Sequence, residues 1–138
     1  MDARELMIGD WARIRYNHFE TGEEIVKDFR VGQLAKLGIG DDEPLYAWSE
    51  KSNMAKVSKV EPIPLTPEIV EKNGFERGSD NLFSYGRGMY VMMWSKWHYS
   101  VGQIFGNMSA FVEFAEIRFI HELQHALRLC GIEKEIEI

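Results

Sequence analysis

EIRFIHELQHALRLCG, residues 116–131, is the most regular stretch of the chain and predicts a C-terminal helix. At 100° per residue its apolar side chains fall on one stripe, and its histidines fall on the opposite side with the charged residues. Gly131 suits the left-handed position that ends a helix, whereas Ala110–Ile117 fits a strand and a first helical turn equally well. The stripe expected to face the core is Ile120, Leu123, Leu127 and Cys130, flanked by Phe119 and Ala126.

Residues 121–125 of this helix match the H-E-x-x-H pattern, in which two histidines one turn apart bind zinc and the glutamate acts as general base. A catalytic zinc site also needs a third protein ligand, and no such residue is evident downstream of the motif. Arg118 and Arg128 share the face of the histidines and oppose a divalent metal. We therefore expect no metal ligand and no catalytic residue here, with Arg118 and Glu122 paired on a solvated face. The alternative is a zinc-dependent hydrolase that uses His121, Glu122 and His125.

Composition narrows the class of protein. The chain has 138 residues, enough for one domain or two small subdomains, and its 45% hydrophobic and 12% aromatic content predicts a well-filled interior. A net charge of −6 argues against broad nucleic-acid binding, although a local basic patch can lie within an acidic total. The single Cys130 is expected to be buried, and the charged N-terminus does not resemble a signal peptide. We expect a cytoplasmic protein without cofactor or membrane contact.

The first half of the chain predicts short strands. Residues 5–16 end in alternation, with Ala12, Ile14 and Tyr16 on one side of a half-buried strand. Further strands are expected in residues 25–37, which could hold one or two, and in residues 45–48 and 54–60, with a glycine-rich turn at residues 38–42. Their spacing predicts a small five-stranded, SH3-like barrel or half-barrel.

Residues 61–67, EPIPLTP, form the clearest boundary because they hold three of the four prolines. The same segment begins a short helix. Thr66 is a good N-cap, Pro67 is tolerated at the first helical position, and Gly74 ends the element.

After this helix the sequence predicts a loop at residues 76–81 and strands at residues 82–85, 89–94 and 97–104, with a turn at 106–107. The last residues, 132–138, alternate apolar residues with glutamates, as an edge strand or a frayed tail does. We therefore expect an α+β protein: a β-rich subdomain in residues 1–62, and in residues 63–138 a helix, a short antiparallel sheet and the long C-terminal helix.

Three segments of the chain resemble a known group of proteins. These are residues 7–11 (MIGDW), residues 61–75 with EPIPLTPEI and Gly74-Phe75, and residues 117–131. They look like segments of small uncharacterised proteins encoded in prophages and mobile elements of gut Bacteroidetes. The resemblance implies no established activity. In those relatives the final helix carries Gln and Asn where this sequence has Glu122 and His125, which argues further against a zinc site.

Aromatic residues are frequent between residues 85 and 99, and such rings can stack on single-stranded bases. Strand alternation favours a core role instead, because it buries one face of each strand. Base stacking is also disfavoured, because the only cations between the rings are Arg87 and Lys96. The group consists of Tyr85, Tyr90, Trp94, Trp97 and Tyr99.

Our leading hypothesis is a non-enzymatic binding or accessory protein that contacts another protein, because the sequence offers no convincing catalytic constellation. One alternative is the zinc hydrolase described above. The other is a nucleic-acid-binding protein that uses Arg13, Arg15 and Lys27 of the N-terminal barrel. An exposed aromatic patch beside basic residues would favour nucleic acid.

Overall fold

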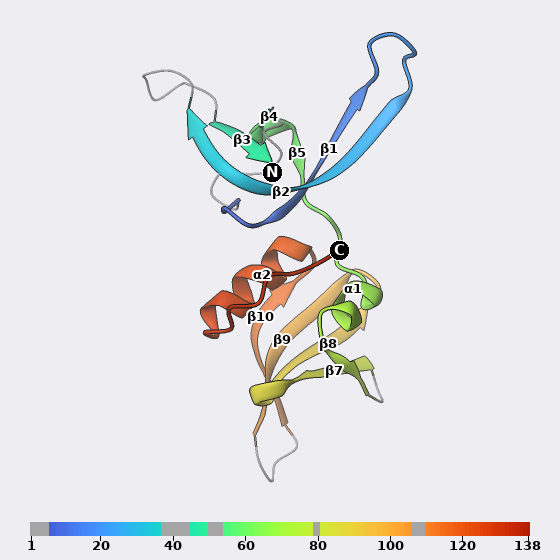
Figure 1. The fold of residues 1–138 in the computed structure, drawn as a ribbon. Helices are drawn as coiled ribbons and strands as arrows, with labels where there is room; N and C mark the ends of the chain where they lie inside the picture. Colours follow the sequence, from blue (N-terminus) through green and yellow to red (C-terminus); the bar gives the residue numbers. More distant parts are fainter. Residues whose placement is uncertain (1–5, 37–44, 50–53, 79–80, 106–109) are drawn as a thin grey trace. The chain divides into compact units, whose positions relative to one another are not determined.

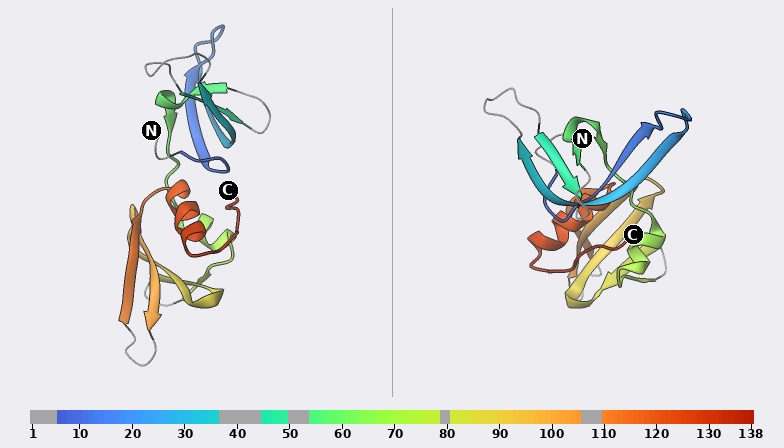
Figure 2. Two further views of the ribbon diagram at one scale, coloured as in Figure 1. Left: turned by 90° about the vertical axis from the view of Figure 1, so that its left-hand side faces the viewer. Right: turned by 45° about the horizontal axis from the view of Figure 1, so that its top comes forward.

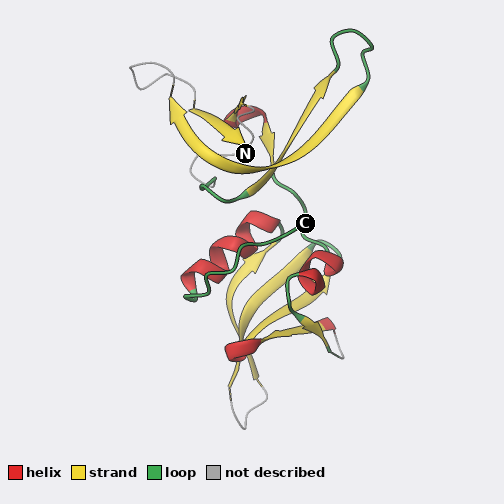
Figure 3. Ribbon diagram, viewed as in Figure 1, coloured by secondary structure: helices red, strands yellow, loops and turns green. Residues whose placement is uncertain are grey.

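The computed structural model describes residues 6–36, 45–49, 54–78, 81–105 and 110–138. The chain divides into two compact units, Met1–Ile63 and Pro64–Ile138. In the described residues each unit contains one antiparallel sheet of five strands, and both α-helices, α1 and α2, belong to the second unit (Figures 1 and 3). The described fold is therefore mostly β, with more strand than the predicted α+β arrangement. Independent folding of residues 1–62 and 63–138 stays a prediction.

The sheet of the N-terminal unit has the order β4-β3-β2-β1-β5. Its long strand β2 was expected as one or two strands and is a single element that curves along its length (Figures 1 and 2). The curvature coincides with a register shift between Val31 and Gln33, since a bulge bends a strand. The strands are β1 (Trp11–Asn17), β2 (Glu24–Lys36), β3 (Leu45–Ser49), β4 (Met54–Lys56) and β5 (Val60–Glu61), with the 3-10 turn η1 (Val57–Lys59) before β5.

This sheet is open in the part of the chain that the structure describes. Strand β2 pairs with β1 through its first half and with β3 through its second half, and the short strands β4 and β5 form the two edges. The described residues therefore form an open five-stranded sheet and not a closed barrel, which was one of the two arrangements predicted from strand spacing. The predicted turn at residues 38–42 lies outside the described residues. The buried core of the unit is Leu6, Ala12, Val31, Ala47, Val57 and Val60.

Helix α1 (Pro67–Lys72) begins and ends as its sequence predicts. The Thr66 hydroxyl accepts a hydrogen bond from the Ile69 amide at 3.3 Å, which satisfies one of the free N–H groups of the first turn. Gly74 has a φ of 91° and ends the helix. Val70 is the fully buried anchor of the element.

The second sheet has the order β10-β9-β8-β7-β6 and lies in the C-terminal unit (Figure 1). Part of the segment expected as a loop forms the short strand β6, and the ambiguous segment before the C-terminal helix is a strand, β10. The predicted turn at residues 106–107 lies outside the described residues. The strands are β6 (Glu76–Arg77), β7 (Leu82–Tyr85), β8 (Met89–Ser95), β9 (His98–Phe105) and β10 (Ala110–Ile117), with the 3-10 turn η3 (Gly86–Gly88) before β8.

Helix α2 (Ile120–Leu129) is shorter than the predicted stretch because residues 116 and 117 belong to β10. The expected apolar stripe is buried at Ile120, Leu123 and Leu127. Cys130, however, is exposed, since the helix ends before it and Gly131 turns the chain with a φ of 75°. The prediction of a buried thiol is therefore wrong. No helix in the described ranges is long and apolar enough to cross a membrane.

The C-terminal tail is neither an edge strand nor a frayed end. The Gln124 amide donates to the Lys134 carbonyl at 2.7 Å and accepts from the Ile136 amide at 2.8 Å. Asn73, at the end of α1, makes the same pair of bonds with the backbone of Glu137. These two side-chain amides hold the tail in place, and Ile136 is fully buried.

Tyr99 in β9 is fully buried, and within the described part of the chain its hydroxyl has no hydrogen-bond partner. Burial raises the pKa of this phenol, because the ionised form is poorly solvated. The resulting contribution to stability is fully present below about pH 10 and is lost as the pH rises through the higher folded-state pKa. We expect Tyr99→Phe to keep or raise the unfolding free energy at neutral pH, by at most about 1 kcal/mol.

The same substitution should reduce the alkaline loss of stability in urea-unfolding curves recorded between about pH 8 and 11, by the share that comes from Tyr99. A decrease of about 2 kcal/mol or more at neutral pH would mean that the hydroxyl is hydrogen-bonded in solution.

Candidate functional site

An open groove of about 1150 Å³ lies in the N-terminal unit, among β1, β2, β4 and η1. It is large enough for a chain-like ligand of several residues or nucleotides, since small-ligand pockets typically span about 300–1,000 Å³. The lining residues of the groove are Trp11, Ile14, Arg15, Tyr16, Lys27, Asp28, Phe29, Arg30, Ser49, Met54, Ala55, Lys56 and Lys59.

Positive charge dominates this lining. Among the described residues Asp28 is the only carboxylate of the lining, and no described carboxylate pairs with Lys56 or Lys59. A chain with a net charge of −6 therefore has a local basic surface. Such a surface attracts an anionic ligand. The cations of the groove are Arg15, Lys27, Arg30, Lys56 and Lys59.

Aromatic rings lie beside these cations. Trp11 and Arg30 face each other across β1 and β2, and the Arg30 guanidinium lies 5.0 Å from the centre of the indole ring. The Lys27 ammonium lies 5.9 Å from the centre of the Tyr16 ring, which is 40% exposed. Both distances fit cation–π contacts. The groove thus offers flat apolar surfaces and positive charge to the same ligand.

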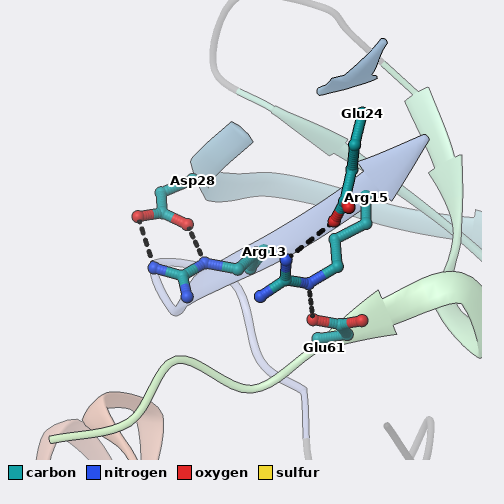
Figure 4. A network of polar contacts seen from close by, with 5 residues as sticks. All are labelled: Arg13, Arg15, Glu24, Asp28 and Glu61. Atoms are coloured by element: carbon teal, nitrogen blue, oxygen red, sulfur yellow. Dashed lines mark hydrogen bonds and ion pairs between the residues drawn. The ribbon is translucent and has the colours of Figure 1, made fainter. Parts of the chain in front are cut away.

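Ion pairs fix the strands on which the groove is built (Figure 4). The Arg13 guanidinium on β1 donates to both carboxylate oxygens of Asp28 on β2, at 2.7 and 3.1 Å. Arg15 donates to Glu61 on β5 at 2.8 Å and to Glu24 on β2 at 2.9 Å. These hydrogen bonds raise the pKa of both arginines, so both stay charged at every physiological pH.

Two of the three residues predicted for nucleic-acid binding line the groove, and the third does not. Arg15 and Lys27 line the groove, whereas Arg13 lies outside the lining and is held by Asp28. The sequence pattern does not single out three further residues of the groove, Trp11, Lys56 and Lys59. The last two precede β5 on the segment expected as a strand, and only the turn η1 places them together with β1 and β2.

The three candidate zinc residues lie on α2, but not in the predicted arrangement. His121 is only 3% exposed, so the prediction that it points into solvent is wrong. Its ring stacks on Phe119 at 5.9 Å and meets the edge of the half-buried His125 ring at 5.6 Å. The neighbouring rings of Phe119 and His125 contact the imidazole, and hydrophobic periodicity alone does not predict these contacts.

Glu122 has a structural role at the start of α2. One of its carboxylate oxygens accepts hydrogen bonds from the backbone amides of Arg118 and Phe119, both at 3.2 Å. This capping satisfies N–H groups at the helix N-terminus and replaces the predicted ion pair with the Arg118 side chain. A general base would need this carboxylate to leave its cap.

The aromatic group of the C-terminal unit is split between core and surface. Tyr99 is fully buried, as expected for a core residue, whereas Trp94 and Trp97 are 58% and 63% exposed. The Lys96 ammonium lies 5.1 Å from the centre of the Trp97 ring. Strand alternation fails to bury the two tryptophans because they lie at the end of β8 and in the turn before β9.

Comparison of the chain with protein-family models, curated proteins and solved structures gives no match.

Proposed function

We propose that this chain is a non-enzymatic binding protein whose N-terminal unit holds a segment of single-stranded nucleic acid. The single observation that carries the proposal is the groove in which cations and aromatic rings lie side by side. Proteins that bind single strands without sequence preference combine these two features, since cations follow the phosphates and rings stack on the bases.

The positive charge of the groove favours an anionic polymer over a neutral polymer as its ligand. Lys56 and Lys59 follow one another along β4 and η1, and Lys27 lies on β2, which β3 separates from β4 in the sheet. Two other charged residues of the groove, Arg15 and Asp28, are held in ion pairs with residues outside its lining. A row of lysines along a groove neutralises successive phosphates, and each neutralised phosphate releases counterions.

The aromatic rings favour nucleic acid over an acidic peptide. Tyr16 is exposed beside Lys27, so its face can stack on a base while the ammonium contacts a neighbouring phosphate. An acidic peptide would use the cations and leave this ring without a matching flat partner. A duplex is a poorer fit for the same reason, because its bases are stacked on one another.

The N-terminal unit is proposed to be an SH3-like module. The strand order β4-β3-β2-β1-β5, the curved strand shared by the two halves of the sheet, and the 3-10 turn before β5 support this assignment. Such folds serve many functions, so the proposed ligand is inferred from the groove and not from the fold.

Fluorescence anisotropy of the full chain with a labelled oligodeoxythymidine of about twelve nucleotides tests the proposal. We expect binding that weakens with salt, and Lys56→Gln with Lys59→Gln should reduce the magnitude of the salt slope by about 1.4. Tyr16→Ala should weaken binding by about 1–3 kcal/mol, which is the contribution of one stacked base.

Matched control variants distinguish an effect of the groove residues on binding from an effect of net charge alone. Lys36→Gln with Lys96→Gln makes the same change in net charge outside the groove, and Phe19→Ala removes an exposed ring from the loop between β1 and β2. Equal losses in control and groove variants would contradict the proposal. Binding of a polyglutamate peptide without binding of the oligonucleotide would assign the groove to an acidic protein segment instead.

A second candidate function is contact with a protein partner through the C-terminal unit. The observation that favours it is the exposure of Trp94, Trp97 and Phe114, since large exposed aromatic side chains are enriched at protein interfaces. An accessory role in a prophage or mobile element, which the resemblance of the sequence suggests, is compatible with both functions. Variants of the groove would leave this contact intact.

A further inference from the structure

We infer that the C-terminal sheet carries a site for a divalent transition-metal ion, Zn²⁺, formed by His98 on β9 and by Glu113 and Glu116 on β10. One potential ligand atom from each of these side chains lies within 4.8 Å of the other two. The site is separate from the HELQH helix and from the groove of the N-terminal unit. Four observations on this sheet support it.

First, a β-bulge places both glutamates on one face. Residues three apart in a regular strand point to opposite faces of the sheet. The register of β10 against β9 shifts between Glu113 and Ala115, so Phe114 is an extra residue that resets the alternation. Glu113 and Glu116 can therefore reach the same ion. Bulges often aim side chains at functional sites in this way.

Second, the register brings the histidine to the same place. Glu116 lies opposite Ser100 and Glu113 lies opposite Gly102. Both partners alternate with His98 along β9, so the three β9 residues share the face of the glutamates. The candidate ligands thus come from adjacent rungs of one antiparallel pair. An ion held by them would join β9 to β10.

Third, a buried hydroxyl orients one of the carboxylates. Ser100 is fully buried; its hydroxyl donates to a Glu113 oxygen at 2.5 Å and accepts from the Trp94 indole N–H at 2.7 Å. Metal-binding carboxylates are commonly held by such outer hydrogen bonds, which fix their orientation. The hydrogen bonds from Trp94 to Ser100 and from Ser100 to Glu113 use one Glu113 oxygen and leave the other oxygen for an ion.

Fourth, the imidazole is aimed at the carboxylates. The Nε2 atom of His98 is inaccessible to solvent and lies 3.3 Å from a Glu116 oxygen, without the alignment of a hydrogen bond to any described residue. Two ligands of a tetrahedral zinc ion lie about 3.4 Å apart, given metal–ligand bonds of about 2.1 Å. Small rotations of the two side chains are therefore enough to accept the ion.

The chemistry of the three ligands favours zinc over magnesium or calcium. One imidazole and two carboxylates are borderline and hard donors that suit Zn²⁺, whereas Mg²⁺ and Ca²⁺ prefer oxygen alone. Three protein ligands leave the fourth tetrahedral position for water.

Isothermal titration of the metal-free full chain with ZnCl₂ tests the site, with thermal unfolding as a second readout. We expect one ion per chain and an unfolding midpoint that rises with zinc and falls back on chelation. Ser100→Ala should weaken binding by about 10- to 100-fold, as outer-shell changes do. His98→Ala and Glu116→Gln should each weaken it further, while far-ultraviolet circular dichroism of the metal-free variants reports that the fold is retained.

His18→Ala and Glu133→Gln are matched controls, since both residues lie outside the cluster, and they should bind zinc as the wild type does. His125→Ala tests the HELQH helix and should also be without effect. Absence of binding at equimolar zinc, or binding that survives His98→Ala unchanged, would overturn the inference. Loss of binding in His125→Ala would move the site to α2 and overturn it equally.

Discussion

Replacement of Leu127 by alanine is expected to lower the free energy of unfolding by about 2–5 kcal/mol. Leu127 lies on the core stripe of α2 and is fully buried, so the shorter side chain removes apolar contacts and leaves a cavity. Urea unfolding followed by circular dichroism measures the difference, provided that the slope of the transition is unchanged.

Leu129→Ala is the matched control on the same helix. Leu129 is 89% exposed, so its truncation should change the unfolding free energy by no more than about 0.5 kcal/mol. Similar effects of the two substitutions would show that the buried face of α2 is assigned wrongly.

Gly102→Ala is the second substitution with a large expected effect. A Cβ atom on Gly102 would lie 2.1 Å from the carbonyl oxygen of Val112 and 2.9 Å from the Phe111 ring. The first contact is with backbone, so β9 and β10 would have to move apart at the bulge. We expect a loss of about 1–3 kcal/mol or more in unfolding free energy, as in overpacked cores.

Gly86→Ala serves as its control because a Cβ at Gly86 meets no atom within 4 Å. This variant should unfold as the wild type does in the same urea titration. A Gly102→Ala protein of wild-type stability would contradict the close approach of the two strands. It would also remove the geometric basis for placing Glu113 beside His98.

The sequence predicts those elements whose signals are local. Thr66, Pro67 and Gly74 act on the backbone within a few residues, so both ends of α1 follow from the sequence alone. The same holds for Gly131 and the buried stripe of α2. Nothing in these features depends on which strands become neighbours.

The polar side of α2 contacts more of the chain than its periodicity predicts. Hydrophobic periodicity assigns the face of His121 to solvent, whereas this side chain is 3% exposed and contacts the rings of Phe119 and His125. The amide of Gln124 holds the backbone of the C-terminal tail, and the tail has no periodic pattern that predicts this position. A polar residue that binds backbone is indistinguishable in sequence from one that faces water.

The groove and the metal cluster depend on strand register, which is also hidden in the sequence. Lys56 and Lys59 join Tyr16 only through the order of strands in the first sheet. Glu113 and Glu116 share a face only because Phe114 is bulged out, and regular alternation predicts the opposite. Both sites therefore require pairing information that a single sequence does not contain.

The most direct test of the central claim is an amide NMR titration of the full chain with an unlabelled oligodeoxythymidine of about twelve nucleotides. We expect saturable shift changes at the groove, centred on Tyr16, Lys27 and Lys59, and no comparable changes at Trp94 or Trp97. Unchanged groove signals at low salt, or shifts confined to the C-terminal unit, would contradict it.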